Sequence, residues 1–190
     1  MKKLLIFSMI LFFCLLFLIG CVGNLSNLFL LTVPDDGGMD EYDPNFISLI
    51  KNLNTPEKLS SWLKNNTTFK NNFGSLTPYE FYLKREGDCN DYKIFNCYVL
   101  HYNGYNVNQL NVKFNNLTGH GLAIFENKGN KPYKYGIVNV KSSVTNGKIL
   151  GKQFNYNTIS GVIESLEYWY ERKIIIYSID SWNNFIYKNN

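Results

Sequence analysis

The sequence predicts an α+β fold, in which several helices are followed by a mainly antiparallel sheet. Apolar residues recur at helical spacing in the first half, and from Leu110 onward the apolar period changes to two. The chain has 190 residues, which allows one compact domain and an appendage. Hydrophobic residues make up 45% and charged residues 18%, so the chain is able to bury a core and is not a disordered tail.

The first 42 residues are not expected to belong to the fold. Lys2 and Lys3 precede an almost wholly apolar run, which is typical of a signal peptide. The run ends in Leu18-Ile19-Gly20-Cys21, which resembles the lipobox of bacterial lipoproteins, where the cysteine is acylated. We therefore expect a signal peptide over 1–20, lipidated Cys21 with a tether over 21–42, and a domain over 43–190, exposed on the bacterial cell envelope and facing away from the cytoplasm. An uncleaved anchor or plain secretion are the alternatives.

Three helix starts are marked by a polar residue followed by proline. Asp43-Pro44, Thr55-Pro56 and Thr77-Pro78 each combine an N-cap residue with proline in the first turn. The first two open apolar patterns that reach Leu53 and Leu63. Helices are expected at all three positions.

A fourth helix is predicted from Cys89 to His101 or Tyr102. Asp88 is a suitable N-cap, and Asp91 stands three residues later as in a capping box. Asn103-Gly104 supplies the end of the helix.

The remaining chain reads mainly as strands. Alternation through Leu110 and Phe114, and the β-type runs over 120–126 and 133–140, predict an antiparallel meander. An amphipathic helix is expected over 158–172, followed by a buried strand over 174–177.

Cys89 is the candidate nucleophile. At the start of a helix, unpaired N–H groups and the helix dipole stabilise a thiolate, so we expect the pKa of Cys89 to be lowered. The same N–H groups are able to bind an oxyanion. Asp88 and Asp91 oppose part of this effect, so an imidazolium partner is required.

The predicted helix discriminates between the two histidines of the chain. His101 would lie about 18 Å from Cys89 at roughly 1.5 Å per residue, too far to act as its base. The same rise puts Cys97 about 12 Å from Cys89, too far for a disulfide, and Cys97 is interpreted as a small buried helix residue. His120, at the head of a strand, is left as the candidate base.

Asn139 is the first candidate for the group that orients the imidazole. If Gly129-Asn130 is the centre of the turn, Asn139 pairs with His120 on the neighbouring strand. Asp180, after the isoleucine-rich strand, is the reserve candidate.

The segments Gly87 to Tyr92, Leu100 to Tyr105 and Gly119-His120 together resemble the transglutaminase-like superfamily, most closely its bacterial cysteine-proteinase-like branch. The resemblance implies a papain-like core with the nucleophile helix packed on the sheet. It implies Cys89 as nucleophile, His120 as general base and acid, and Asn139 as the orienting group, with Asp88 and Asp91 in support. The sequence differs from the family at Lys93, where Ala is common.

The expected function is acyl transfer on a peptide or protein amide bond, as a peptidase, an amidase or a transglutaminase. Neither a cofactor nor a metal is implied, since no ligand spacing for zinc occurs. Dispersed lysines and arginines argue against a nucleic-acid partner, and the membrane would be reached through acyl chains on Cys21. The alternative is a non-catalytic binding or assembly module of the same fold on the cell envelope.

Overall fold

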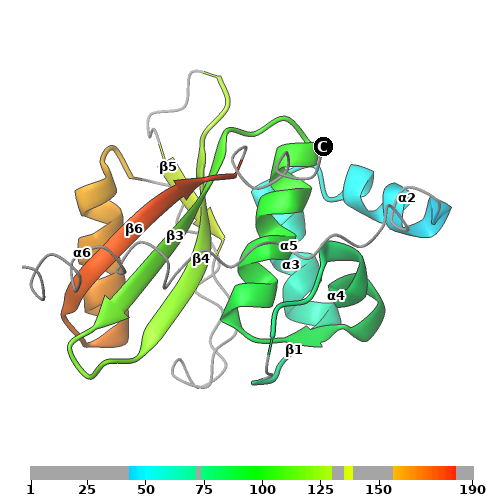
Figure 1. The fold of residues 1–190 in the computed structure, drawn as a ribbon. Helices are drawn as coiled ribbons and strands as arrows, with labels where there is room; N and C mark the ends of the chain where they lie inside the picture. The colour runs from blue at the N-terminus through cyan, green and yellow to red at the C-terminus, as the bar shows by residue number, and fades with distance from the viewer. Residues whose placement is uncertain (1–42, 72–73, 130–134, 139–155, 183–190) are drawn as a thin grey trace, which may run out of the picture. The chain divides into compact units, whose positions relative to one another are not determined.

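The computed structural model describes residues 43–71, 74–129, 135–138 and 156–182 (Figure 1). The expectations for the signal peptide, Cys21, the tether and Asn139 lie outside these residues. In the part of the chain that is described, no helix is long and apolar enough to span a membrane.

Four helices precede the main sheet, and all four predicted starts are confirmed. They are α2 (Pro44–Asn52), α3 (Pro56–Asn66), α4 (Pro78–Lys84) and α5 (Cys89–Tyr102). The first three begin with proline in the first turn after the N-caps Asp43, Thr55 and Thr77. Two short strands, β1 (Thr68–Phe69) and β2 (Glu86–Gly87), pair in parallel between them.

The main sheet contains β3 (Val107–Phe114), β4 (Gly119–Glu126), β5 (Tyr135–Val138) and β6 (Ile174–Ser181). The strand order is β5-β4-β3-β6, and every pairing is antiparallel. Helix α6 (Ile159–Tyr170) connects the meander to β6. The predicted α+β class, with the Cys89 helix packed on a mainly antiparallel sheet, is confirmed.

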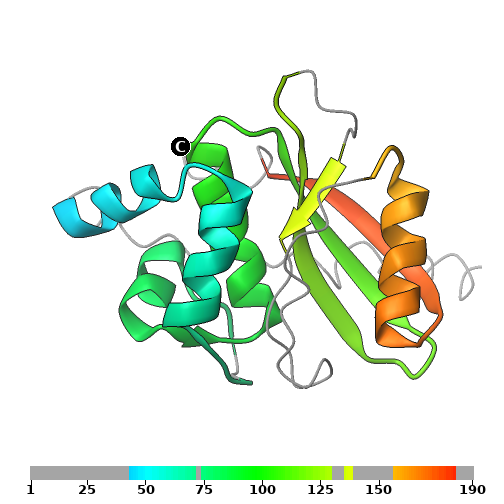
Figure 2. The same ribbon diagram turned by 180° about the vertical axis from the view of Figure 1, so that it is seen from behind.

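The sheet separates two cores, because alternate strand residues point to opposite faces. On one face, Val107, Ala123 and Phe125 pack with α5 and the helices before it. On the other face, Leu110 and Leu122 pack with α6, which lies beside β6 in both views (Figures 1 and 2). Both faces of β3 and β4 are therefore covered.

The strand predicted over 174–177 is confirmed as part of β6, but the prediction that it is buried is wrong. Ile175, Ile176 and Tyr177 are each about half exposed. Among the described strands, β6 pairs only with β3 and forms an end of the sheet, so its side chains are less covered than those of β3 and β4.

Candidate active site

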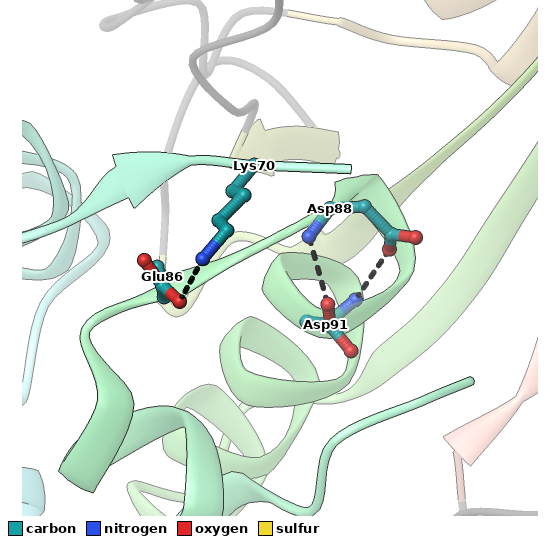
Figure 3. Close-up of polar contacts among 4 residues, drawn as sticks. All are labelled: Lys70, Glu86, Asp88 and Asp91. Atoms are coloured by element: carbon teal, nitrogen blue, oxygen red, sulfur yellow. Dashed lines mark hydrogen bonds and ion pairs between the residues drawn. The ribbon is translucent and has the colours of Figure 1, made fainter. Parts of the chain in front are cut away.

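The first turn of α5 holds Cys89 as the first residue of the helix. The carboxylate of the N-cap Asp88 accepts hydrogen bonds from the N–H of Asn90 at 2.8 Å and from that of Asp91 at 3.4 Å. Asp91 Oδ2 accepts one in return from the Asp88 N–H at 2.7 Å (Figure 3). The predicted capping box is confirmed, and it fixes the backbone on both sides of the sulfur.

Asp91 is fully buried and uses both carboxylate oxygens on backbone groups. Oδ2 bonds Asp88, and Oδ1 accepts a hydrogen bond from the N–H of Leu76 at 2.7 Å. A Cβ on Gly87 would lie 2.6 Å from Asp91 Oδ2, so the residue before the cap has to be glycine. Asp91 therefore supports the site through the backbone and does not face a substrate.

The chain enters this cap from the short parallel pair of β1 and β2. Lys70 Nζ and Glu86 Oε1 are 2.7 Å apart beside it (Figure 3). Both side chains are largely exposed, so this ion pair contributes less than about 1 kcal/mol. The backbone ladder between Phe69 and Gly87 is the firmer constraint on the approach to Cys89.

Burial raises the pKa of the Cys89 thiol. The N–H of Gly121 donates to the sulfur and lowers the pKa, as do the charge of Lys93 and the N–H of Cys89, whereas Asp88 raises it. The expectation of a lowered pKa is wrong, because desolvation outweighs the helix terminus. The hydrogen bond from Gly121 places the sulfur against β4.

His120 lies on β4, but its side chain belongs to the opposite face of the sheet. Its Nε2 and the hydroxyl of Tyr170 on α6 are 2.8 Å apart, and the residue is 8% exposed. Leu122, the next residue on that face, packs in the core with α6. The structure therefore brings Gly121 to the Cys89 sulfur and turns the His120 ring toward α6, so the expected meeting of thiol and imidazole is not part of this arrangement.

The strand register differs from the one used to choose Asn139. The predicted turn pairs Ala123 with Gly136, whereas the structure pairs Ala123 with Val138. The pairing is shifted by two residues because the connection from β4 to β5 is much longer than a two-residue turn.

Asp180, the reserve candidate, belongs to a chain of polar side chains that we did not predict. Asp180 Oδ2 accepts hydrogen bonds from Asn111 Nδ2 at 3.0 Å and from Ser178 Oγ at 3.2 Å. Asn111 Oδ1 accepts one from Lys93 Nζ at 2.6 Å. The chain runs from the end strand β6, across β3, to α5.

Lys93 is 2% exposed and lies where β4 passes Cys89. A Cβ on Gly121 would come within 3.0 Å of Lys93 Cδ and 3.3 Å of its Nζ. Burial lowers the pKa of Lys93, while Cys97 and Cys89 in their thiolate forms, and the carboxylates of Asp180 and Asp88, oppose that shift. A lysine four residues after Cys89, on a buried helix face, is the signal in the sequence that would have found it.

The α5–sheet interface buries further polar groups. Gln109 shares a sheet face with Asn111, and its Nε2 has no hydrogen-bond partner among the described residues. The same holds for both amide atoms of Asn96, one turn after Lys93 on α5. The amide groups of Gln109 and Asn96 therefore keep donors and acceptors that the packing of α5 on the sheet does not use.

The interpretation of Cys97 as a buried helix residue is confirmed. It is free and fully buried, and burial raises its pKa. Because α5 is continuous from Cys89 to Tyr102, the distance argument against His101 as the base also holds.

Among solved structures, several chains match this one. The solved structure of Legionella pneumophila LapG (calcium-bound) is 17% identical, with a TM-score of 0.43, over 72% of this chain and 75% of that chain. No family model matches the sequence, and no curated protein does. Within the described residues, no group of three or more His, Cys, Asp or Glu side chains is placed to hold a metal ion.

Proposed function

We propose that this chain is a transglutaminase-like thiol enzyme that uses Cys89 as its nucleophile. The observation that carries the proposal is the position of the sulfur. It stands at the first residue of α5, receives the N–H of Gly121, and is flanked by the Asp88–Asp91 capping box. Because His120 faces α6, we do not assign it the role of base.

The proposed reaction is acyl transfer from an amide. The Cys89 thiolate attacks the amide carbonyl carbon, the amine leaves with a proton, and a thioester remains on the enzyme. Water then gives hydrolysis, as in a peptidase or amidase, and a second amine gives transamidation. Since burial raises the pKa of Cys89, the thiol needs a neighbouring base during the attack.

The proposed location is the bacterial cell envelope. The apolar run that ends at Gly20-Cys21 supports lipidation of Cys21, and acyl chains at roughly 0.8 kcal/mol per buried methylene would hold the protein on a membrane. Peptide or protein amides exposed at that surface are the proposed substrates.

The direct test compares the full chain in detergent with its Cys89→Ser variant on a degenerate peptide library read by mass spectrometry. We expect cleavage by the unaltered chain and a loss of at least about 100-fold in the cleavage rate of the variant, because a serine hydroxyl is a weaker nucleophile than a cysteine thiol. Hydroxylamine added to the assay should capture the thioester as a hydroxamate. Cys97→Ser is the matched control and should retain cleavage. Equal activity of Cys89→Ser and the unaltered chain would contradict the proposal.

A non-catalytic binding or assembly module is the second candidate. It is favoured by the two features that depart from a Cys-His site, namely the raised pKa of Cys89 and the His120–Tyr170 contact. Absence of both cleavage and hydroxamate, with the chain folded, would support this candidate over the enzyme.

A further inference from the structure

A buried lysine lies beside the proposed nucleophile and has no part in the chemistry described above. We propose that Lys93 is the proton acceptor of the Cys89 thiol and that Asn111 and Asp180 position its amine. This inference rests on the proposed acyl-transfer function and names the base that the function requires.

The fold brings the two groups to one point on β4. Lys93 follows Cys89 by four residues, so the two side chains lie on the same face of α5. Gly121 donates its N–H to the Cys89 sulfur, and a Cβ on Gly121 would stand 3.3 Å from Lys93 Nζ. The Cys89 sulfur and the Lys93 amine therefore both lie beside Gly121.

Two amide oxygens hold the amine of Lys93. Its Nζ donates to Asn111 Oδ1 at 2.6 Å and to Asn90 Oδ1 at 3.3 Å. An ammonium group has three N–H donors, whereas a neutral amine has two N–H donors and a lone pair. The two oxygens therefore occupy two donors of Lys93 in either protonation state, and in the neutral form the lone pair is able to accept a proton.

Burial favours the neutral form of the Lys93 amine. Lys93 is 2% exposed, and desolvation disfavours its charged form. The carboxylates that act on it are Asp88, the N-cap of α5, and Asp180 on β6, and their negative charges favour the ammonium. The Cys89 sulfur does the same once it is a thiolate, whereas burial raises the pKa of Cys97 and keeps that thiol uncharged. A proton accepted from Cys89 is therefore stabilised by these neighbours after transfer.

Asn111 and Asp180 set the direction of the amine. The amide Nδ2 of Asn111 donates to Asp180 Oδ2 at 3.0 Å. Because an ionised carboxylate only accepts hydrogen bonds, this contact fixes the NH₂ end of Asn111 on Asp180 and its oxygen on Lys93. Both act through Lys93 and are positioning residues.

Lys93 is able to carry each proton that the proposed reaction moves. The neutral Lys93 amine takes the thiol proton as the Cys89 sulfur forms its bond to the amide carbon. The resulting ammonium gives that proton to the leaving nitrogen as the C–N bond breaks. In the second half, Lys93 takes a proton from the attacking water and returns it to sulfur as the C–S bond breaks.

The first test measures kcat/KM for amide cleavage in Lys93→Met, with Lys51→Met on α2 as the control for loss of an exposed lysine. We expect a loss of about 10²–10⁴-fold for Lys93→Met and no more than about twofold for the control. A loss of less than about threefold in a folded Lys93→Met variant would overturn the proposal. So would a result in which His120→Gln abolishes cleavage and Lys93→Met does not.

Asp180→Asn is the second variant, since it keeps the lysine. Asp180 raises the pKa of Lys93, so its neutralisation lowers that pKa and makes the amine neutral at a lower pH. The acidic limb of the pH–kcat/KM profile should move to lower pH. An unmoved limb would mean that Asp180 is structural and does not act through Lys93.

Alkylation of Cys89 by iodoacetamide separates failure of this inference from failure of the enzyme proposal. The ammonium that forms when Lys93 accepts the thiol proton lowers the pKa of Cys89. Lys93→Met should therefore move the alkylation midpoint of Cys89 to higher pH, whether or not a peptide is cleaved. Peptide mapping resolves Cys89 from the other cysteines. An unchanged midpoint overturns the coupling of Lys93 to Cys89 even if the chain is an active Cys89 enzyme.

Discussion

Gly121 is the residue at which the candidate site depends most closely on the absence of a side chain. Its N–H contacts the Cys89 sulfur, while the space where a Cβ would stand is filled by Lys93 and by Asn90 Oδ1 at 3.2 Å. The N–H of Gly121 therefore lies beside Cys89, and the lack of a side chain at Gly121 leaves room for Lys93. Gly119, two residues earlier on β4, has no such crowding, since a Cβ there would come no closer than 3.7 Å to the Val112 carbonyl.

Gly121→Ala should therefore displace the Lys93 side chain and destabilise the fold. We expect a loss of about 1–3 kcal/mol in the free energy of unfolding, measured with urea, because extra volume in a packed site forces side chains away from their preferred positions. The alkylation midpoint of Cys89 should rise as Lys93 moves away. Gly119→Ala is the matched control, with a change within about 0.5 kcal/mol. Similar losses in both variants would contradict this account.

Helix α5 depends on a carboxylate at the third residue of its first turn. Asp91 accepts hydrogen bonds with both oxygens, one from the Asp88 N–H and one from the Leu76 N–H. The capping box of α4 is similar in sequence, but Glu80 has one such bond described, from the Thr77 N–H at 2.9 Å. The two helices therefore differ in how much each acidic side chain contributes.

Asp91→Asn should destabilise the protein more than Glu80→Gln does. An Asn at 91 has a single acceptor oxygen, so its NH₂ group must face a backbone N–H, at a cost of about 2–3 kcal/mol. Gln at 80 is able to turn its oxygen toward Thr77 and should cost under about 1 kcal/mol. Urea unfolding of both variants measures the difference. Equal losses would show that the second bond, to Leu76, adds nothing.

In the whole chain, we propose that the membrane anchor at Cys21 and the nucleophile Cys89 belong to separate parts. If acylation of Cys21 is the anchor, Cys21→Ser should shift the protein from the membrane fraction to the soluble fraction, because one apolar run without acyl chains would be cleaved or released. Fractionation followed by immunoblotting measures this. Retention of Cys21→Ser in membranes would indicate an uncleaved apolar anchor. Alkylation of Cys89 should be the same in both forms.

The sequence predicted the elements better than the faces of the sheet. Helix α5 begins at Cys89 as expected, because Asp88 and Asp91 are a local signal that does not depend on the rest of the fold. The direction of His120 was not predictable in this way. Both faces of β4 are apolar, so alternation alone does not tell which face meets α5.

Lys93 was missed for a related reason. A lysine among apolar helix residues is ordinarily expected at a surface, and the acceptors that make its burial possible come from Asn90 and from Asn111 on β3. That pairing depends on how α5 lies on the sheet. Only the spacing from Cys89 was visible in the sequence.

The strand order has a consequence for how the chain is made. The central strand β3 pairs on one side with β4, its immediate successor, and on the other with β6, which is synthesised only after the meander and α6. Until β6 arrives, one edge of β3 has unpaired backbone groups, and such open edges attract strands from other molecules. The nascent protein thus has a vulnerable interval during translation, and forms that stop before Ile174 should aggregate.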